Sequence, residues 1–207
     1  MKHIVYLHGF ASSPDSSKAR YFQHRLEAAG HTVSVPDLEE GNFDGLTISR
    51  QLEVTRHAAG EGKISLIGSS MGGYLAALYA ARHAEVERVV LLAPAFAFAR
   101  RWPLRLGPEV TEKWQKSGRL EVFHYGEGRN RAIGYQLLED GLLYEDFPAV
   151  KQPCLIFHGA LDDVVPASFS QEFAAGRTNV ELHVLDAGHD LLNVLQVMGD
   201  RTEAFLQ

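Results

Sequence analysis

The stretch Gly68-Ser69-Ser70-Met71-Gly72 places a serine at the centre of a G-x-S-x-G pattern. On a sharp turn between a strand and a helix, such a serine can attack an acyl carbon. The pattern arises easily by chance in a chain with 19 glycines, so its context must support it. Here an apolar run precedes it and an Ala/Leu/Tyr-rich segment follows, which predicts a strand and then a helix. Ser70 is therefore the candidate nucleophile, and Ser69 is expected to be a small residue of the turn.

A serine hydroxyl is a weak nucleophile near neutral pH, so it needs a base that is itself oriented by a third group. His189, in "AGHD" directly after the last predicted strand, is the best candidate base. His8 and His158 each precede a glycine at a strand end, where we expect them to shape their loops. His183 lies within a strand and is expected to be a packed or half-exposed strand residue.

Two adjacent acids in "HGALDDVVP", Asp162 and Asp163, could orient the base. The residue types alone leave both open, because either carboxylate could instead cap the helix that follows. Asp186 and Asp190 bracket His189. Residues so close in sequence seldom aim a carboxylate at the outer imidazole nitrogen, so these two are outside candidates.

Attack on an acyl carbon creates an oxyanion that needs fixed hydrogen-bond donors. The backbone N–H of Met71, at the start of the helix after the turn, is one candidate donor. The N–H of Phe10, in the loop after the first strand, is the other, because this loop is expected to run beside the turn.

Short apolar, β-branched runs alternate with amphipathic stretches along the chain, which predicts a parallel sheet covered by helices on both faces. In such a sheet ligands bind beyond the carboxyl ends of the strands, where the serine, the acids and the histidine all fall. The predicted strands lie at about 3–9, 31–38, 63–68, 86–94, 153–159 and 180–186, and the helices at about 16–29, 46–59, 71–83, 167–175 and 191–206.

Residues 95–150 are too many for a simple crossover between the fourth and fifth strands, and we expect a small helical cap over one end of the sheet. The stretches "PEVTEKWQKSG" and "NRAIGYQLLED" are predicted to be helical, with "RLEVFHYGEG" extended between them. Phe10, Trp102 and Trp114 are expected to form the wall of a substrate pocket. The basic segment "RRWPLR" is expected to be solvated surface.

Composition is that of an ordinary globular protein, and we expect one domain over residues 1–207. Apolar residues make up 45% of the chain and charged residues 22%. The net charge of −6 disfavours nucleic acid or an anionic membrane as a partner. The chain shows no signal peptide, membrane span, phosphate-binding loop or cysteine-rich metal site, so we expect a cytoplasmic protein without metal or cofactor.

Four motifs in chain order, "HGF", "GSSMGG", "HGALDDVVP" and "AGHD", together resemble the α/β-hydrolase family. The opening "MKHIVYLHGFASSPDSSKAR" is similar to that of the small YqiA-like esterases. The resemblance implies Ser70 as nucleophile, Asp162 as acid and His189 as base, with Phe10 and Met71 supplying the oxyanion donors. It also implies an α/β-hydrolase fold with a doubly wound, six-stranded, mostly parallel sheet in the order 2-1-3-4-5-6.

The leading hypothesis is a serine hydrolase that cleaves small-molecule carboxylic esters or thioesters of small to medium acyl groups through an acyl-enzyme. A peptidase or amidase that uses the same triad is the alternative. A non-catalytic binding protein on the same scaffold is less favoured, because a serine, an acid and a histidine are all present in the required order.

Overall fold

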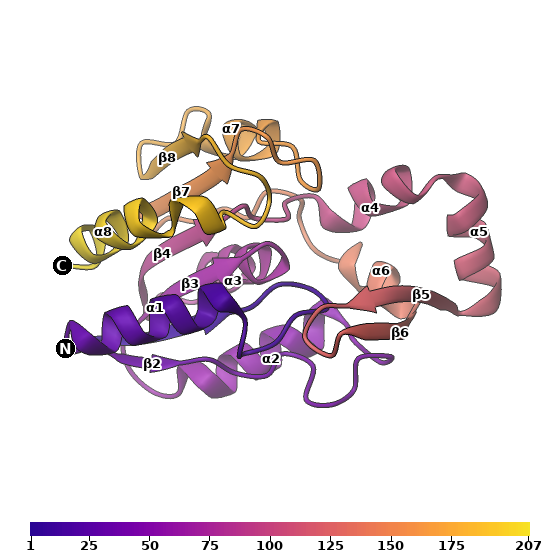
Figure 1. The fold of residues 1–207 in the computed structure, drawn as a ribbon, viewed down its shortest axis with the longest axis horizontal. Helices are drawn as coiled ribbons and strands as arrows, with labels where there is room; N and C mark the ends of the chain where they lie inside the picture. Colours follow the sequence, from indigo (N-terminus) through magenta and orange to yellow (C-terminus); the bar gives the residue numbers. More distant parts are fainter.

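The computed structural model describes residues 1–207, and a six-stranded parallel sheet runs through its centre (Figure 1). Every pair of neighbouring strands is parallel. The order β2-β1-β3-β4-β7-β8 confirms the predicted one, with β7 and β8 as the fifth and sixth strands. The strands are β1 (His3–Leu7), β2 (Thr32–Ser34), β3 (Ile64–Ser69), β4 (Val86–Leu92), β7 (Cys154–Gly159) and β8 (Val180–Leu185).

The central strands are apolar at nearly every position because both faces of the sheet are buried. Successive side chains of a strand point to opposite faces. In β1, Ile4 and Tyr6 therefore enter one hydrophobic cluster, while Val5 and Leu7 enter the other. This arrangement explains why the strands read as continuous apolar runs rather than as alternating ones.

Helices cover both faces of the sheet (Figure 1). The smaller hydrophobic cluster lies under α1 (Ser17–Ala28) and α8 (Leu195–Leu206), which contact each other, and a short 3-10 turn, η1 (Leu192–Val194), leads into α8. The larger cluster lies under the helices of the opposite face, which are α2 (Ile48–Ala59), α3 (Met71–Arg82) and α7 (Ser168–Ala174). No helix has the length and apolar character needed to cross a bilayer.

The chain between β4 and β7 extends beyond the carboxyl end of the sheet (Figure 1). It contains two helices, then an antiparallel hairpin, then a short helix. These are α4 (Phe98–Leu106), α5 (Pro108–Ser117), β5 (Arg119–His124), β6 (Arg129–Gly134) and α6 (Gln136–Gly141).

The prediction that "NRAIGYQLLED" is helical throughout was wrong for its first half. Asn130 to Gly134 form most of β6, which pairs in antiparallel register with β5, and only the second half is the helix α6. The turn "YGEG" makes this pairing possible, because Gly128 adopts a left-handed conformation with φ of 65° and its N–H donates to the His124 carbonyl at 2.8 Å. A pairing partner along the chain thus overrides the local helical pattern.

The packing of α1 on the sheet predicts a large stability effect at Phe22, which is fully buried and stacks on Tyr6. Phe22→Ala is expected to lower the free energy of unfolding by about 3–5 kcal/mol, because it leaves a cavity. Urea unfolding measures the change. His24→Ala, at an exposed position of the same helix, is the matched control and should change stability by less than about 0.5 kcal/mol. Equal losses in the two variants would contradict the described packing.

Candidate active site

Ser70 lies between β3 and α3 in a backbone conformation that residues other than glycine rarely adopt, with φ of 54° and ψ of −115°. Two hydrogen bonds hold this conformation. The Ser70 N–H donates to the carbonyl of Leu92 at 2.8 Å, and the Ser70 carbonyl accepts from the N–H of Ala95 at 2.9 Å. The Ser70 hydroxyl does not cap α3, so its oxygen stays available for other partners.

Two glycines around Ser70 are required because neighbouring backbone atoms leave no room for a Cβ, not because the turn needs a flexible backbone. A Cβ at Gly72 would lie 2.1 Å from the carbonyl oxygen of Leu7, at the end of β1. A Cβ at Gly68 would lie 2.2 Å from the carbonyl oxygen of Gly72. The first turn of α3 therefore packs directly against the backbone of β1 and β3, and only hydrogen atoms fit between them.

His189, in the loop after β8, bridges the serine and the acid. Its Nε2 lies 3.0 Å from the Ser70 Oγ, and its Nδ1 lies 2.7 Å from the Asp162 Oδ2. A carboxylate only accepts hydrogen bonds, so Nδ1 carries the proton and Nε2 can accept from the Ser70 hydroxyl. The imidazole is 21% exposed, which leaves its serine end within reach of a ligand.

Asp162, after β7, is held by donors on both of its carboxylate oxygens. Oδ1 accepts from the N–H groups of Val164 at 2.9 Å and Val165 at 2.7 Å. His158 Nε2 lies 3.2 Å from Oδ2, beside the bond from His189. Burial alone would raise the pKa of this carboxyl, but the bonds from His158, His189 and the Val165 N–H outweigh burial and lower the pKa below its usual range. The acid is therefore ionised whenever the histidine is active.

The other residues considered from the sequence have different places. Asp163, Asp186 and Asp190 are exposed, and none of them bonds to His189. Ser69 is buried beneath the turn, as expected for a small structural residue. His8 joins its own loop to the segment after β2, with Nδ1 2.9 Å from the Gly9 carbonyl and Nε2 accepting from the N–H of Leu38 at 3.2 Å.

The loop after β1 runs beside the serine. A Cβ at Gly9 would lie 3.5 Å from the Ser70 Cβ, in ordinary contact. The N–H of Phe10, the next residue, has no backbone acceptor. Met71 is the first residue of α3, so its N–H has no acceptor within the helix. The two N–H groups considered for the oxyanion thus come from segments that meet at Ser70.

An aromatic cluster extends from this loop into the β4–β7 segment. The rings of Phe10 and Trp102 are 5.2 Å apart, and both side chains are half-buried. Trp114 packs behind Trp102 with a ring separation of 5.1 Å, is completely buried, and donates from Nε1 to the Ile133 carbonyl at 3.0 Å. The expectation that Trp114 lines a pocket needs correction, because in this conformation it offers no surface to a ligand and instead supports Trp102.

The segment "RRWPLR" is more than solvated surface. Arg101 and Arg105 both donate to the carbonyl of Val164, at 2.7 Å and 2.9 Å, in the loop that carries Asp162. His158 was likewise expected only to shape its loop, yet it also contacts the Asp162 carboxylate. The sequence shows the histidine and the acid four residues apart, but it gives no sign of the arginine contacts, because they join segments about 60 residues apart.

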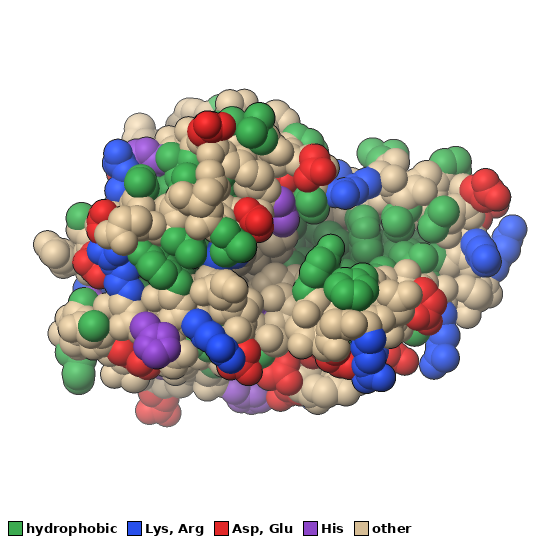
Figure 2. Space-filling view, in the orientation of Figure 1, with side chains coloured by type: hydrophobic (Ala, Val, Ile, Leu, Met, Phe, Trp, Pro, Cys, Tyr) green, Lys and Arg blue, Asp and Glu red, His purple; other side chains and the backbone are tan.

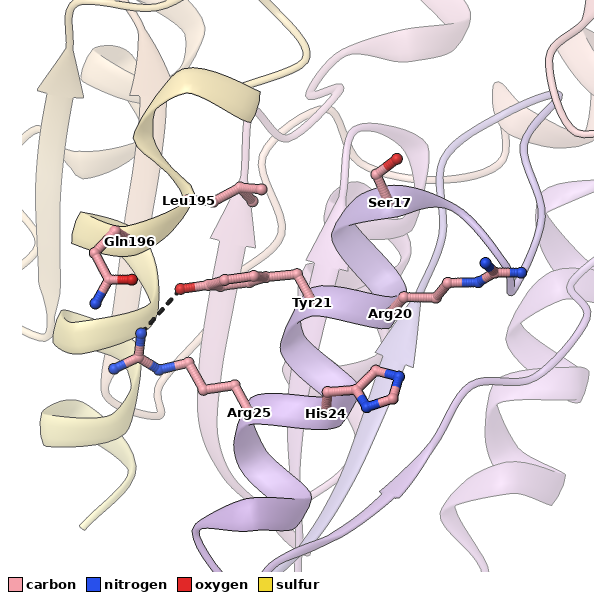
Figure 3. A pocket seen from close by; sticks show the side chains of 7 residues that line it. All are labelled: Ser17, Arg20, Tyr21, His24, Arg25, Leu195 and Gln196. Carbon is pink, nitrogen blue, oxygen red and sulfur yellow. Dashed lines mark hydrogen bonds between the residues drawn. The ribbon is translucent and has the colours of Figure 1, made fainter.

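A hollow of about 510 Å³ lies between α1 and α8 (Figure 3). Arg25, which lines it, is already paired with Asp200 at 2.5 Å and Glu203 at 2.6 Å and donates to the Tyr21 hydroxyl at 2.9 Å. None of the Ser70, His189 and Asp162 side chains lines it. No group of three or more His, Cys, Asp or Glu side chains is arranged to hold a metal ion.

Comparison with known proteins shows the family of this chain. The profile of an uncharacterised protein family, UPF0227, matches residues 3–206. The chain belongs to this family. This match confirms the resemblance to the YqiA-like proteins, and the fold is that of the α/β hydrolases.

Three relatives illustrate the range of proteins with this fold. The AB hydrolase superfamily protein YisY of Bacillus subtilis is 30% identical over 56% of this chain and 56% of its own length. The bovine mitochondrial palmitoyl-protein thioesterase ABHD10 is 24% identical over 88% of this chain. The structure of Est1E from Butyrivibrio proteoclasticus with ferulic acid bound superposes with a TM-score of 0.82, 20% identity, and coverage of 100% of this chain and 88% of that one.

The chain spans less than two thirds of the two curated relatives it matches, namely 56% of the B. subtilis protein and 64% of bovine ABHD10. The chain has the α/β-hydrolase fold, and its curated relatives include an AB hydrolase superfamily protein and a palmitoyl-protein thioesterase.

The contact of Gly72 with β1 leads to a first prediction for the site. Gly72→Ala is expected to lower the free energy of unfolding by about 3 kcal/mol, because a Cβ would overlap the Leu7 carbonyl oxygen and α3 would have to shift. Thermal and urea unfolding measure the loss. Gly188→Ala is the control, since its Cβ would meet nothing within 4 Å. An undisturbed Gly72→Ala protein would show that α3 does not pack as described.

The lowered pKa of Asp162 predicts how the stability of the protein depends on pH. A depressed pKa means that ionised Asp162 stabilises the fold fully above the ordinary carboxyl pKa of about 3.9 and that this contribution is lost as the pH falls through the lower folded-state value. The difference in unfolding free energy between the wild type and Asp162→Asn should therefore not shrink between about pH 7 and pH 5, and it should shrink below about pH 4. A difference that already shrinks between pH 7 and pH 5 would mean that the pKa is raised instead.

Proposed function

We propose that this protein is a serine hydrolase that cleaves carboxylic esters or thioesters of small to medium acyl groups through an acyl-enzyme. The observation that carries the proposal is the continuous chain of contacts from Ser70 through His189 to Asp162, at 3.0 Å and 2.7 Å. Three residues far apart in sequence meet in the geometry that activates a serine hydroxyl.

In the proposed reaction, His189 Nε2 takes the proton of the Ser70 hydroxyl as the oxygen attacks the acyl carbon. The N–H groups of Phe10 and Met71 donate to the oxyanion that forms, a contribution worth about 10² to 10³ in rate for each donor. His189 then gives its proton to the leaving alkoxide or thiolate. Water enters, loses a proton to the same nitrogen, and releases the acid from Ser70.

Asp162 keeps the imidazole in the productive tautomer and stabilises the imidazolium that forms in each half-reaction. Its carboxylate is ordered before a substrate arrives, because two backbone N–H groups hold Oδ1. Such preorganisation avoids a reorganisation cost during the reaction.

We assign the acyl group to the hollow beside the carboxyl end of the sheet. Figure 2 shows hydrophobic side chains gathered there, between the helices α4 and α5 and the β5–β6 hairpin. These elements carry apolar side chains that remain exposed: Leu104 is 83% exposed, Phe123 49% and Tyr125 77%. Phe10 and Trp102 would form the wall nearest the serine. In this proposal residues 95–150 act as a cap that binds the acyl part of a small-molecule ester.

The relatives support the choice of substrates to be tested. One curated relative is named a palmitoyl-protein thioesterase, and Est1E is seen with an aromatic acid, ferulic acid. Thioesters and aromatic esters therefore belong in the test beside simple alkyl esters.

Ser70→Ala is the direct test of the nucleophile. Because an alanine has no hydroxyl to acylate, kcat for p-nitrophenyl acetate and butyrate should fall by about 10⁴-fold or more. Ser69→Ala is the matched control, since the side chain of Ser69 is buried beneath the turn, and it should retain most of the wild-type kcat. Retained hydrolysis in purified Ser70→Ala protein would contradict the proposed function.

A substrate panel separates this proposal from the peptidase alternative, which would use the same three residues. Acetyl, butyryl and octanoyl esters, their thioesters, and aminoacyl arylamides are compared at equal concentration. The proposal expects turnover of the esters or thioesters and little of the arylamides. Preferential cleavage of the arylamides would favour the peptidase.

A further inference from the structure

Arg101 and Arg105, one turn apart on α4, converge on a single backbone oxygen. Both donate from Nη1 to the carbonyl of Val164, at 2.7 Å and 2.9 Å. The neighbouring Arg100 pairs with the carboxylate of Asp146 at 2.8 Å, whereas Arg101 and Arg105 form no ion pair. Arg101 also lies over the ring of Phe169 at 5.7 Å. The two arginines fix α4 to the loop after β7.

The carbonyl they bind belongs to the same peptide group as the N–H of Val165. That N–H donates to the Asp162 Oδ1 at 2.7 Å. One peptide group therefore has two guanidinium groups at its oxygen and a carboxylate at its hydrogen. Hydrogen bonds in series polarise one another, so the cations strengthen the hold of the Val165 N–H on the carboxylate.

The charge balance around Arg101 and Arg105 depends on Asp162. Burial lowers the pKa of Arg101, the nearby charge of Arg105 lowers it further, and the negative charge of Asp162 opposes both effects. Two cations on one carbonyl repel each other. The Asp162 carboxylate, at the opposite end of the peptide, provides the compensating negative charge.

We propose that Arg101 and Arg105 are positioning residues that hold the Asp162 carboxylate through the Val164–Val165 peptide and thereby couple the position of α4 to the reactivity of Ser70. The inference rests on the proposed function, because it assumes that Asp162 orients His189 for attack by Ser70. Without the contacts from α4, the Val165 N–H would lose its polarisation and would hold the carboxylate less firmly. The β4–β7 segment thus sets the activity of the triad as well as the shape of the hollow.

Arginine substitutions with and without charge test this coupling. Arg101→Gln, Arg105→Gln and the double variant remove the charge, while Arg101→Lys and Arg105→Lys keep it. The measurements are kcat and KM for a neutral and an anionic p-nitrophenyl ester, the rate of covalent labelling by a fluorophosphonate probe, and the low-field proton resonance of the His189–Asp162 hydrogen bond. Arg100→Gln is the matched control on the same helix, and the melting temperature of every variant is recorded.

The double Gln variant should lose about tenfold in kcat and in labelling rate, as expected when a hydrogen bond to a charged group is weakened, with KM for the neutral ester unchanged. Its low-field resonance should shift or broaden. The Lys variants should recover most of the kcat, and Arg100→Gln should match the wild type. If the double variant does not fold, Arg105→Gln gives the same readouts, because Arg105 is at the exposed end of the contact.

Wild-type labelling rate and an unchanged resonance in the Gln variants would overturn the inference. So would a rise in KM confined to anionic esters with kcat unchanged, because the arginines would then bind ligand rather than position the acid. A wild-type protein that the probe does not label would contradict the proposed function instead. In that case the resonance still reports whether the arginines hold Asp162.

Discussion

The backbone at Ser70 is the constraint on which the rest of the site depends. A serine with φ of 54° is unfavourable in isolation and persists only where the surrounding structure determines it. Here the determinants are two hydrogen bonds, to Leu92 and from Ala95, and the contact of Gly72 with the end of β1. The sheet order places β3 between β1 and β4, so both neighbouring strands contribute to holding the turn. The serine thus lies between two buried elements, β3 and α3.

Asp162 and His189 come from the loops after β7 and β8, and the structure holds them by different means. Asp162 is fixed by its own loop, through the N–H groups of Val164 and Val165, and by the buried His158 behind it. His189 is held by its bond to that acid. The orientation of His189 therefore depends on that of Asp162. Arg101 and Arg105 of α4 bind the Val164 carbonyl in the Asp162 loop. Interactions that order the loop of Asp162 therefore order the His189 side chain as well.

Much of this arrangement could be predicted from the sequence, because local patterns specify it. The buried strands are continuous apolar runs, and their polar ends fall on one edge of a parallel sheet, which brings Ser70, Asp162 and His189 together. The choice between Asp162 and Asp163 needed the family resemblance, since both residues follow the same strand. The strand β6 was missed because its pairing with β5, rather than its own residue pattern, decides its conformation. The burial of Trp114 and the contacts of Arg101 were not predictable, because they depend on partners in other elements of the chain.

Covalent labelling measures whether the strained turn at Ser70 presents a reactive hydroxyl. The purified protein is treated with a fluorophosphonate, its intact mass is measured, and the modified peptide is mapped. A single adduct on Ser70 and none on Ser69 is the expected result. An unmodified protein, or an adduct on Ser69, would contradict it.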